Sequence, residues 1–352
     1  MKRKKTRAIS VGSTRIGGSN PVVVQSMVKT DPQNLQQTLG QLRELKRVGC
    51  EVAAVALAHE DICRSIPFLK KEVEMPIVGD VLFNQAIALK AMELGIDGVL
   101  INPGMIGNVR KVKEVATAAR ESHIPVSIAI DIGSLEKRIQ KKYQTPNAAA
   151  VVESALYHTR LLEDAGHTAI EISLRASGML ETVEAYRRFS DASDYPLCLH
   201  LPEGGPLFSG VIRSSAGLAI LLNEGVGDTI RVSLTGSPVA EVAAAYHLLR
   251  GLGLRKRGVN IVSCPTCCKC RVDLRGIVAE FEKETSHIDT YLNVAIMGCE
   301  ANGPGEAREA DIGIALGAQR ATLFGKGSVR KTGIRLELAK GVLLEEIANL
   351  SR

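Results

Sequence analysis

Half of the eight cysteines in this 352-residue chain lie in one short segment, SCPTCCKC, at residues 263–270. Within it, Cys264 and Cys267 form a C-x₂-C pair, a spacing that lets two thiolates reach one metal centre from a tight turn. Zinc ribbons and iron–sulfur sites share this spacing. A second segment, MGCEANGPGEA at residues 297–307, adds Cys299 and, seven residues later, Glu306. The two segments together indicate one metal site.

Three cysteines from two strand ends with a carboxylate nearby favour a [4Fe–4S] cluster, in which one iron is not held by sulfur. That iron is an exchangeable position where a substrate can bind. A structural zinc site stays open as the alternative. Cys268 and Cys270 are left over: we expect Cys268 to be a spare buried thiol, and the alternative is a fallback ligand or second redox group. The other cysteines are expected to be core thiols: Cys50, Cys63 and Cys198.

The elements that must position these residues are visible as a repeat. Before residue 240, eight short β-branched runs are each followed by a longer stretch with helical periodicity. The runs occupy residues 21–27, 52–58, 76–81, 98–102, 125–131, 169–175, 196–201 and 228–234. Eight such units in about 230 residues predict an α/β fold, a (β/α)₈ TIM-type barrel. An open doubly wound sheet is the alternative.

The repeat of strand and helix patterns ends after residue 250. The glycine-rich, basic stretch GLGLRKRG at 251–258 reads as a linker, and the strand and helix patterns beyond it predict a small α/β domain. We therefore expect a substrate-binding barrel at residues 1–250 and an iron–sulfur domain at residues 251–352. The basic start, MKRKKTR, is expected to be a solvated, disordered end.

Composition narrows the function class. The net charge of +6 is modest, and aromatic residues make up only 3% of the chain, too few to suit a general nucleic-acid binder. No apolar run approaches the roughly 18 residues that span a bilayer. We expect a soluble, cytoplasmic protein with no membrane partner. In that reducing compartment, clustered cysteines indicate metal or redox chemistry rather than disulfides.

SCPTC together with MGCEANGPGEA strongly resembles the 4-hydroxy-3-methylbut-2-enyl diphosphate synthase family (IspG, also GcpE) of the methylerythritol phosphate route to isoprenoids. The likeness runs almost the full length of the chain. It includes VQSM at 24–27, INPG at 101–104, IGN at 106–108, GSLEK at 133–137, EGVGDTIRVSL at 224–234 and EADIG at 309–313.

The resemblance implies a two-electron reduction, with flavodoxin or ferredoxin as donor, that opens a cyclic diphosphate by breaking a C–O bond. It also implies a head-to-tail homodimer, in which the [4Fe–4S] domain of one subunit caps the barrel of the other. The implied cluster ligands are Cys264, Cys267, Cys299 and Glu306. The implied catalytic residues are Glu306, Asn302 in a loop that closes over the substrate, and Glu203 as proton donor.

The chain departs from the family at the positions that hold the diphosphate. Ala54, Leu100 and Ser127 stand where the family has arginine, Leu82 where it has histidine, and Asp131 where it has asparagine. Arg175 replaces a lysine, whereas Arg231, Ser233 and Arg257 match. His200, late in the seventh strand run, is predicted to face the same pocket, and Asp80 and Asn102 lie at strand ends.

Apart from Arg175, which keeps the charge, these replacements all lower the positive charge of one pocket. A diphosphate carries about three negative charges and favours guanidinium forks. We therefore expect a divergent paralogue that keeps the reductive C–O cleavage but acts on a less anionic substrate. The alternatives are the family reaction itself, with drift at these positions, and a non-catalytic cluster protein such as a redox sensor or electron carrier.

Overall fold

The computed structural model describes residues 3–202, 204–299 and 307–351. The chain divides into two compact units, Met1–Arg255 and Lys256–Arg352, each considered by itself. No helix in the described ranges is long and apolar enough to cross a membrane.

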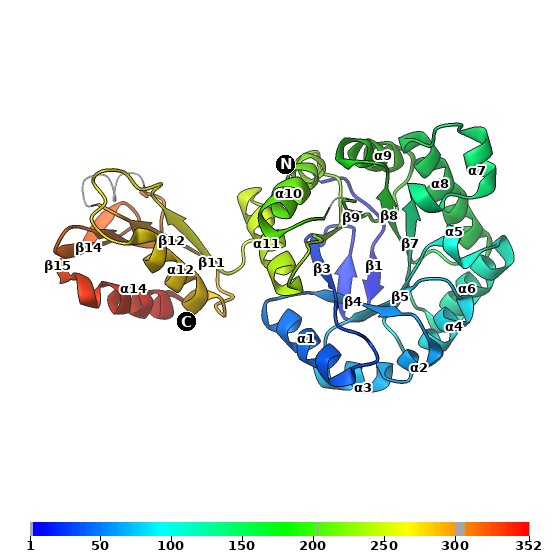
Figure 1. The fold of residues 1–352 in the computed structure, drawn as a ribbon, viewed down its shortest axis with the longest axis horizontal. Coiled ribbons are helices and arrows are strands. Elements are labelled where there is room, and N and C mark those ends of the chain that lie inside the picture. The colour runs from blue at the N-terminus through cyan, green and yellow to red at the C-terminus, as the bar shows by residue number, and fades with distance from the viewer. Residues whose placement is uncertain (1–2, 203, 300–306, 352) are drawn as a thin grey trace. The chain divides into compact units, whose positions relative to one another are not determined.

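Within the described residues, the first unit is built around eight parallel strands (Figure 1). Their order around the ring is β8-β7-β6-β5-β4-β3-β10-β9. The strands are β3 (Val23–Met27), β4 (Val52–Leu57), β5 (Ile77–Val81), β6 (Gly98–Ile101), β7 (Val126–Asp131), β8 (Ile170–Arg175), β9 (Cys198–His200) and β10 (Thr229–Arg231). Each lies within one of the eight predicted runs, so the predicted TIM-type barrel is confirmed.

Helices follow every strand of the ring and cover its outside, as Figure 1 shows. They are α1 (Leu35–Arg47), α2 (Glu60–Cys63), α3 (Ile66–Val73), α4 (Gln85–Glu93), α5 (Pro103–Ile106), α6 (Val109–Ser122), α7 (Lys137–Lys142), α8 (Ala148–Asp164), α9 (Met179–Ala192), α10 (Leu207–Asn223) and α11 (Pro238–Gly251), with a 3₁₀ turn at Ile132–Ser134.

Asparagine side chains begin five of the described helices. Each accepts a hydrogen bond from a backbone N–H in the first turn, which satisfies a donor that the helix leaves unpaired. These caps are Asn34, Asn84, Asn102, Asn108 and Asn147. Three of them lie between a strand and the helix after it, whereas Asn108 lies between α5 and α6 and Asn147 lies between α7 and α8. The caps therefore help to fix the backbone at the end of the barrel where active sites lie.

The ring closes between β8 and β9 by an unusual seam. A single parallel bridge, between Ile172 and Leu197, joins the two edges. Beside it the buried Tyr186 hydroxyl of α9 donates to the Cys198 carbonyl (2.6 Å) and accepts from the N–H groups of Leu174 (3.0 Å) and His200 (3.1 Å). One side chain thus supplies the hydrogen bonds that a continuous ladder would have made.

The chain's start plugs the opposite end of the barrel. The antiparallel strands β1 (Ile9–Val11) and β2 (Thr14–Ile16) pack their apolar side chains against Val23, Val52 and Val78 at the strand beginnings. The prediction of a solvated, disordered basic tail was wrong for the described residues. Arg3 donates to the buried Asp228 carboxylate (2.8 Å), and Arg7 pairs with Asp194 (2.8 Å).

The second unit is a five-stranded mixed sheet with helices against it. The strands β11 (Val259–Ser263), β12 (Leu292–Met297) and β13 (Ile312–Leu316) are parallel, and β14 (Arg320–Gly325) and β15 (Ser328–Arg335) continue the sheet antiparallel. The helices α12 (Leu274–Thr285) and α14 (Leu336–Ser351) share an aliphatic core with the sheet. This agrees with the α/β domain expected from the sequence.

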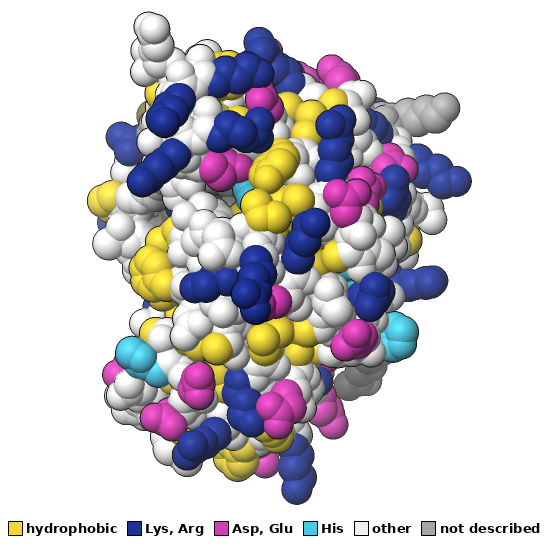
Figure 2. Space-filling model, turned by 90° about the vertical axis from the view of Figure 1, so that its right-hand side faces the viewer, with side chains coloured by type: hydrophobic (Ala, Val, Ile, Leu, Met, Phe, Trp, Pro, Cys, Tyr) yellow, Lys and Arg dark blue, Asp and Glu magenta, His cyan; other side chains and the backbone are white. Residues whose placement is uncertain are grey.

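On the face of the barrel unit shown in Figure 2, lysine and arginine side chains lie among acidic and apolar ones. Many of the cations in the outer helices are paired with carboxylates along or between helices. Examples are Arg110 with Glu114, Lys142 with Glu153, and Arg188 with Glu184. Exposed pairs of this kind contribute little to stability and leave a face of mixed charge.

Candidate active site

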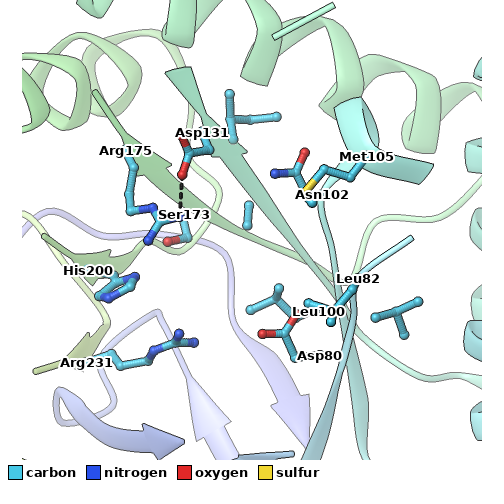
Figure 3. Close-up of a pocket in the computed structure, with 13 residues that line it drawn as sticks. Asp80, Leu82, Leu100, Asn102, Met105, Asp131, Ser173, Arg175, His200 and Arg231 are labelled. Carbon is cyan, nitrogen blue, oxygen red and sulfur yellow. Dashed lines mark hydrogen bonds and ion pairs between the residues drawn. The ribbon is translucent and has the colours of Figure 1, made fainter. Parts of the chain in front are cut away.

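A cavity of about 140 Å³ opens at the carboxyl ends of the barrel strands (Figure 3). Its lining comes from neighbouring strands and the loops after them: Asp80, Val81, Leu82, Leu100, Asn102, Met105, Ala129, Ile130, Asp131, Ser173, Arg175, His200 and Arg231. In this fold, residues at that end of the strands are the ones that carry catalysis. Of the six predicted substrate-binding residues, Asp131, Arg175, His200 and Arg231 meet here.

Asp131 and Arg175 form an ion pair across the cavity wall, drawn as the dashed line in Figure 3. They end the adjacent strands β7 and β8, at directly paired register positions. The carboxylate is held on both sides, because its other oxygen accepts the N–H of Gly133 (2.9 Å) at the start of the 3₁₀ turn. The charge of Arg175 is therefore already paired with a protein carboxylate.

Arg231, on β10, is the second cation of the cavity. Its Nε is buried and has no hydrogen-bond partner among the described residues, and one Nη lies 3.7 Å from the sulfur of Met27. In Figure 3 its guanidinium points toward Asp80 of β5. Burial raises the pKa of Asp80, while the charges of Arg231 and Arg175 act in the opposite direction.

His200, on β9, is buried beside these cations. Its Nε2 lies 2.8 Å from the Ser233 hydroxyl, so Ser233 belongs to the site through the histidine. Burial lowers the pKa of His200 well below its usual value, and the neighbouring charges of Arg231 and Arg175 lower it further. His200 is therefore neutral at physiological pH and can exchange a hydrogen bond with a ligand without adding charge.

The four positions at which the resemblance implies basic residues occupy two levels of the barrel. Leu82 and Leu100 line the cavity and give it an apolar wall. Ser127 lies one layer deeper, where it donates to the fully buried Glu171 (2.8 Å). Ala54 is buried in β4. Only two of the four therefore face the cavity directly.

Some cavity residues were not singled out from the sequence. Ser173 lies between Glu171 and Arg175 in the inward-facing alternation of β8, a signal that strand periodicity contained. Met105 belongs to α5, whose place over the cavity no local pattern indicates. Asn102 donates a hydrogen bond to the Ser134 hydroxyl (2.8 Å) and caps α5. It therefore also connects the segments that follow β6 and β7 at the rim of the barrel.

The cysteines gather at the carboxyl ends of two adjacent parallel strands of the second unit. Cys264 follows β11 and Cys299 follows β12, and β11 pairs directly with β12. The sulfur of Cys264 accepts the N–H of Gly298 (3.3 Å), the kind of amide–sulfur bond that supports a thiolate ligand. Cys267 is exposed in the turn that follows. Three thiols at neighbouring strand ends fit the soft-ligand preference of an iron–sulfur cluster.

Some parts of the predicted metal site are not seen. Among the described residues, no three histidine, cysteine or acidic side chains converge closely enough to hold a metal ion. The predicted ligand Glu306 and the predicted catalytic residues Glu203 and Asn302 lie outside the described residues. The [4Fe–4S] cluster therefore stays a prediction that the three cysteines support by their chemistry and placement.

The two leftover cysteines differ in their surroundings. Cys268 is exposed, so the prediction of a buried thiol was wrong, because the turn after Cys264 points it outward. Cys270 is half-buried: a Cβ added to Gly298 would lie 2.5 Å from its sulfur. Position 298 therefore has no room for a side chain while Cys270 holds this conformation. Cys50, Cys63 and Cys198 are buried in the barrel unit, as expected.

Arg257 was predicted to bind substrate. It belongs to the second unit, where it forms an ion pair with Asp289.

The fold and these residues define a (β/α)₈-barrel protein with a polar cavity at the strand ends and a separate α/β unit that carries paired-strand cysteines. Residues 6–246 match the family described as the GcpE TIM-barrel domain, and residues 260–349 match the GcpE protein C-terminal domain. The chain belongs to the GcpE family.

Curated relatives match both units at once. The chain is 46% identical to the 4-hydroxy-3-methylbut-2-en-1-yl diphosphate synthase (flavodoxin) of Geobacter sulfurreducens over 97% of each chain. It is also 46% identical to the protein of the same name from Thermodesulfovibrio yellowstonii, over 99% of each chain.

Solved structures resemble the barrel unit. Dihydropteroate synthase from Stenotrophomonas maltophilia matches 70% of this chain with a TM-score of 0.53 and 16% identity, over 99% of its own length. A truncated 3-deoxy-D-arabino-heptulosonate 7-phosphate synthase from Thermotoga maritima matches 71% with a TM-score of 0.51 and 16% identity, over 95% of its own length. At such identity these likenesses show the barrel fold alone.

Proposed function

We propose that this enzyme catalyses the reaction for which its curated relatives are named, the flavodoxin-dependent formation of 4-hydroxy-3-methylbut-2-en-1-yl diphosphate. The supporting observation is 46% identity that extends over 97–99% of both chains and so includes the barrel and the cysteine-bearing unit. The chain is an oxidoreductase, which leaves the non-catalytic alternative without support. These comparisons favour the family reaction over the altered substrate expected from the pocket.

A [4Fe–4S] cluster would be held by Cys264, Cys267 and Cys299, with Glu306 as the ligand that the resemblance implies. When bound, it would supply electrons, one at a time, for the reductive opening of the C–O bond of a cyclic diphosphate. The strand ends that carry Cys264 and Cys299 support this assignment.

The barrel's own residues would bind and orient the substrate. Arg231 offers a buried, unpaired Nε to an anionic oxygen, and neutral His200 offers a hydrogen bond beside it. Asp80 and Asp131 can accept hydrogen bonds from hydroxyl groups of the ligand. Glu203 stays the proton donor that the resemblance implies.

A head-to-tail homodimer and a reduced flavodoxin partner are part of the same proposal. Exposed apolar side chains lie in segments that follow barrel strands, and they support a capping partner at that end of the barrel. They are Phe83 in the loop after β5, Leu180 at the start of α9, and Leu207 and Phe208 at the start of α10. Phe208 is 81% exposed and Leu180 68%, so covering them would remove substantial apolar surface from water. A cytoplasmic location stays a prediction.

A second candidate keeps the reductive chemistry but changes the substrate to a less anionic molecule. One observation favours it: the cavity wall carries Leu82 and Leu100, and the Arg175 charge is taken up by Asp131. A diphosphate would meet only one uncompensated guanidinium, Arg231, among the described lining residues.

Anaerobic turnover separates the two candidates. The full-length protein, with iron and sulfide counted, is supplied with reduced flavodoxin and methylerythritol cyclodiphosphate, with Cys264→Ser as the cluster-deficient control. Product formation above the control supports the family reaction. A fully loaded protein that neither binds nor converts the cyclic diphosphate would overturn that reaction and leave the second candidate.

A further inference from the structure

The charged groups that line the barrel cavity balance each other. Among the described lining residues, two are cationic, Arg175 and Arg231, and two are acidic, Asp80 and Asp131, while His200 is neutral. Sites that bind multiply charged anions normally present an excess of guanidinium and amide donors. Among the described lining residues of this cavity, the guanidinium groups do not outnumber the carboxylates.

The placement of Asp131 accounts for most of that balance. Its two oxygens have different partners: one accepts the Gly133 N–H and the other accepts the Arg175 guanidinium. The carboxylate is 27% exposed and Arg175 40% exposed, so the pair lies at the cavity wall where a ligand can reach it. An anionic ligand that approaches Arg175 must compete with a carboxylate that the backbone already positions.

We infer that Asp131 determines the anion specificity of the cavity by holding the Arg175 guanidinium. With Asp131 in place, the cavity accepts a ligand with one anionic group, which binds at Arg231, and with hydroxyl groups that donate to Asp80 and Asp131. Among the described lining residues, a second anionic group has a free cationic partner only if Asp131 releases Arg175. The apolar wall of Leu82 and Leu100 adds no further cation.

The inference rests on the proposed role of the barrel mouth as the substrate site, and it deepens that role under either substrate. If the substrate is a cyclic diphosphate, binding must displace Asp131 from Arg175. If the substrate is less anionic, Asp131 is the residue that excludes the diphosphate.

Binding of inorganic pyrophosphate to the full-length protein tests the inference without turnover. Asp131→Asn keeps the shape and the oxygen that accepts the Gly133 N–H, and replaces the oxygen that accepts Arg175 with an uncharged amide NH₂ group. By isothermal titration at fixed pH and low ionic strength, Asp131→Asn is expected to bind pyrophosphate at least about tenfold more tightly than the parent, about 1.4 kcal/mol.

Two further variants show whether Arg175 carries the gain. Asp131→Asn/Arg175→Gln is expected to return to the parent affinity, since the freed guanidinium is gone. Asp164→Asn is the matched control: it makes the same charge change at an exposed site in the last residue of α8, and is expected to leave affinity unchanged. Thermal unfolding confirms that each variant is folded.

Two results would overturn the inference. One is a folded Asp131→Asn protein that binds pyrophosphate no more tightly than Asp164→Asn. The other is a gain in affinity that persists without Arg175. Neither depends on cluster loading or on the cyclic diphosphate, so failure of the proposed reaction and failure of this inference are distinguishable.

Discussion

The barrel cavity and the cysteine-bearing strand ends differ in how far their side chains already satisfy each other. In the cavity, Asp131 pairs with Arg175, and His200 bonds Ser233. At the strand ends of the second unit, the Cys264 sulfur accepts one amide N–H, and Cys267 is exposed. In the cavity, the Arg175 charge is already paired with a protein carboxylate, whereas the described thiols are open to ligation.

This difference indicates how the two regions acquire function. Under the proposed function, the cysteine end would depend on an added inorganic group, and residue type with strand adjacency would be enough to prepare it. The cavity must discriminate among organic ligands, so its specificity depends on which charges remain uncompensated after the protein's own pairs form. Residue types alone do not show which charges remain uncompensated.

Loss of a cysteine at the strand end should have the largest effect. Cys264→Ser is expected to lower the iron and sulfide bound per chain more than about tenfold, because it removes the sulfur proposed to bind the cluster, which also accepts the Gly298 N–H. Chemical analysis and the visible absorbance spectrum after anaerobic purification measure it. Cys268→Ser, at an exposed neighbour, is the control; equal iron in the two variants would contradict the assignment.

Removal of the seam hydroxyl should affect the barrel alone. Tyr186→Phe leaves three buried backbone groups of β8 and β9 without their partner and is expected to lower the free energy of unfolding by about 4 kcal/mol. Denaturant unfolding measures the loss, with Tyr157→Phe on the outer helix α8 as control. A loss below about 1 kcal/mol would mean that the seam does not depend on this hydroxyl.

A pH effect should arise one layer below the cavity. Burial raises the pKa of Glu171 from 4.5 to about 7, although Thr229 and Ser127 hydrogen-bond its charged form. Since the folded pKa lies above the unfolded one, this group's stability contribution is fully present below about pH 4.5 and is lost as pH rises to about 7. The loss is about 3 kcal/mol.

Glu171→Gln isolates this effect from other titrating groups. The variant cannot ionise, so its stability relative to the parent protein should rise between pH 5 and pH 7.5, as followed by urea unfolding. A difference between the two proteins that does not change with pH would show that Glu171 keeps an ordinary pKa.

The smallest effect is expected at the chain's start. Arg3→Ala leaves the Asp228 carboxylate buried with one partner fewer, and is expected to lower the free energy of unfolding by about 1–2 kcal/mol. Lys5→Ala, at an exposed neighbour, should have almost no effect. Equal stability of the two variants would restore the interpretation of a solvated tail.

Much of the barrel was predictable because its signals are local. The β-branched runs contain every strand of the ring, and a helix follows each strand as the periodicity predicted. The β14–β15 hairpin and the β1–β2 plug were not predicted, because short antiparallel strands have weak periodicity. Lys326 and Gly327 at the β14–β15 turn have positive φ. Of the two, only the glycine is a residue type that indicates such a turn in the sequence.

The candidate site was predictable in its members but not in their pairing. Asp131, Arg175, His200 and Arg231 were singled out from the sequence, and they meet in the cavity. Arg257 forms an ion pair with Asp289 within the second unit, and its role in substrate binding stays a prediction. Ser127 proved to bond a buried carboxyl rather than face the ligand, which depends on the depth of its layer in the barrel.

The sequence by itself determined the alternation of strands and helices, the family and the cysteines available for a cluster, because residue type and spacing along the chain encode them. Only the tertiary structure decided that Asp131 neutralises Arg175, that Tyr186 closes the ring and that Arg3 reaches Asp228. These contacts join residues 12 to 225 positions apart. Their energy depends on distance and burial in space, which no local pattern records.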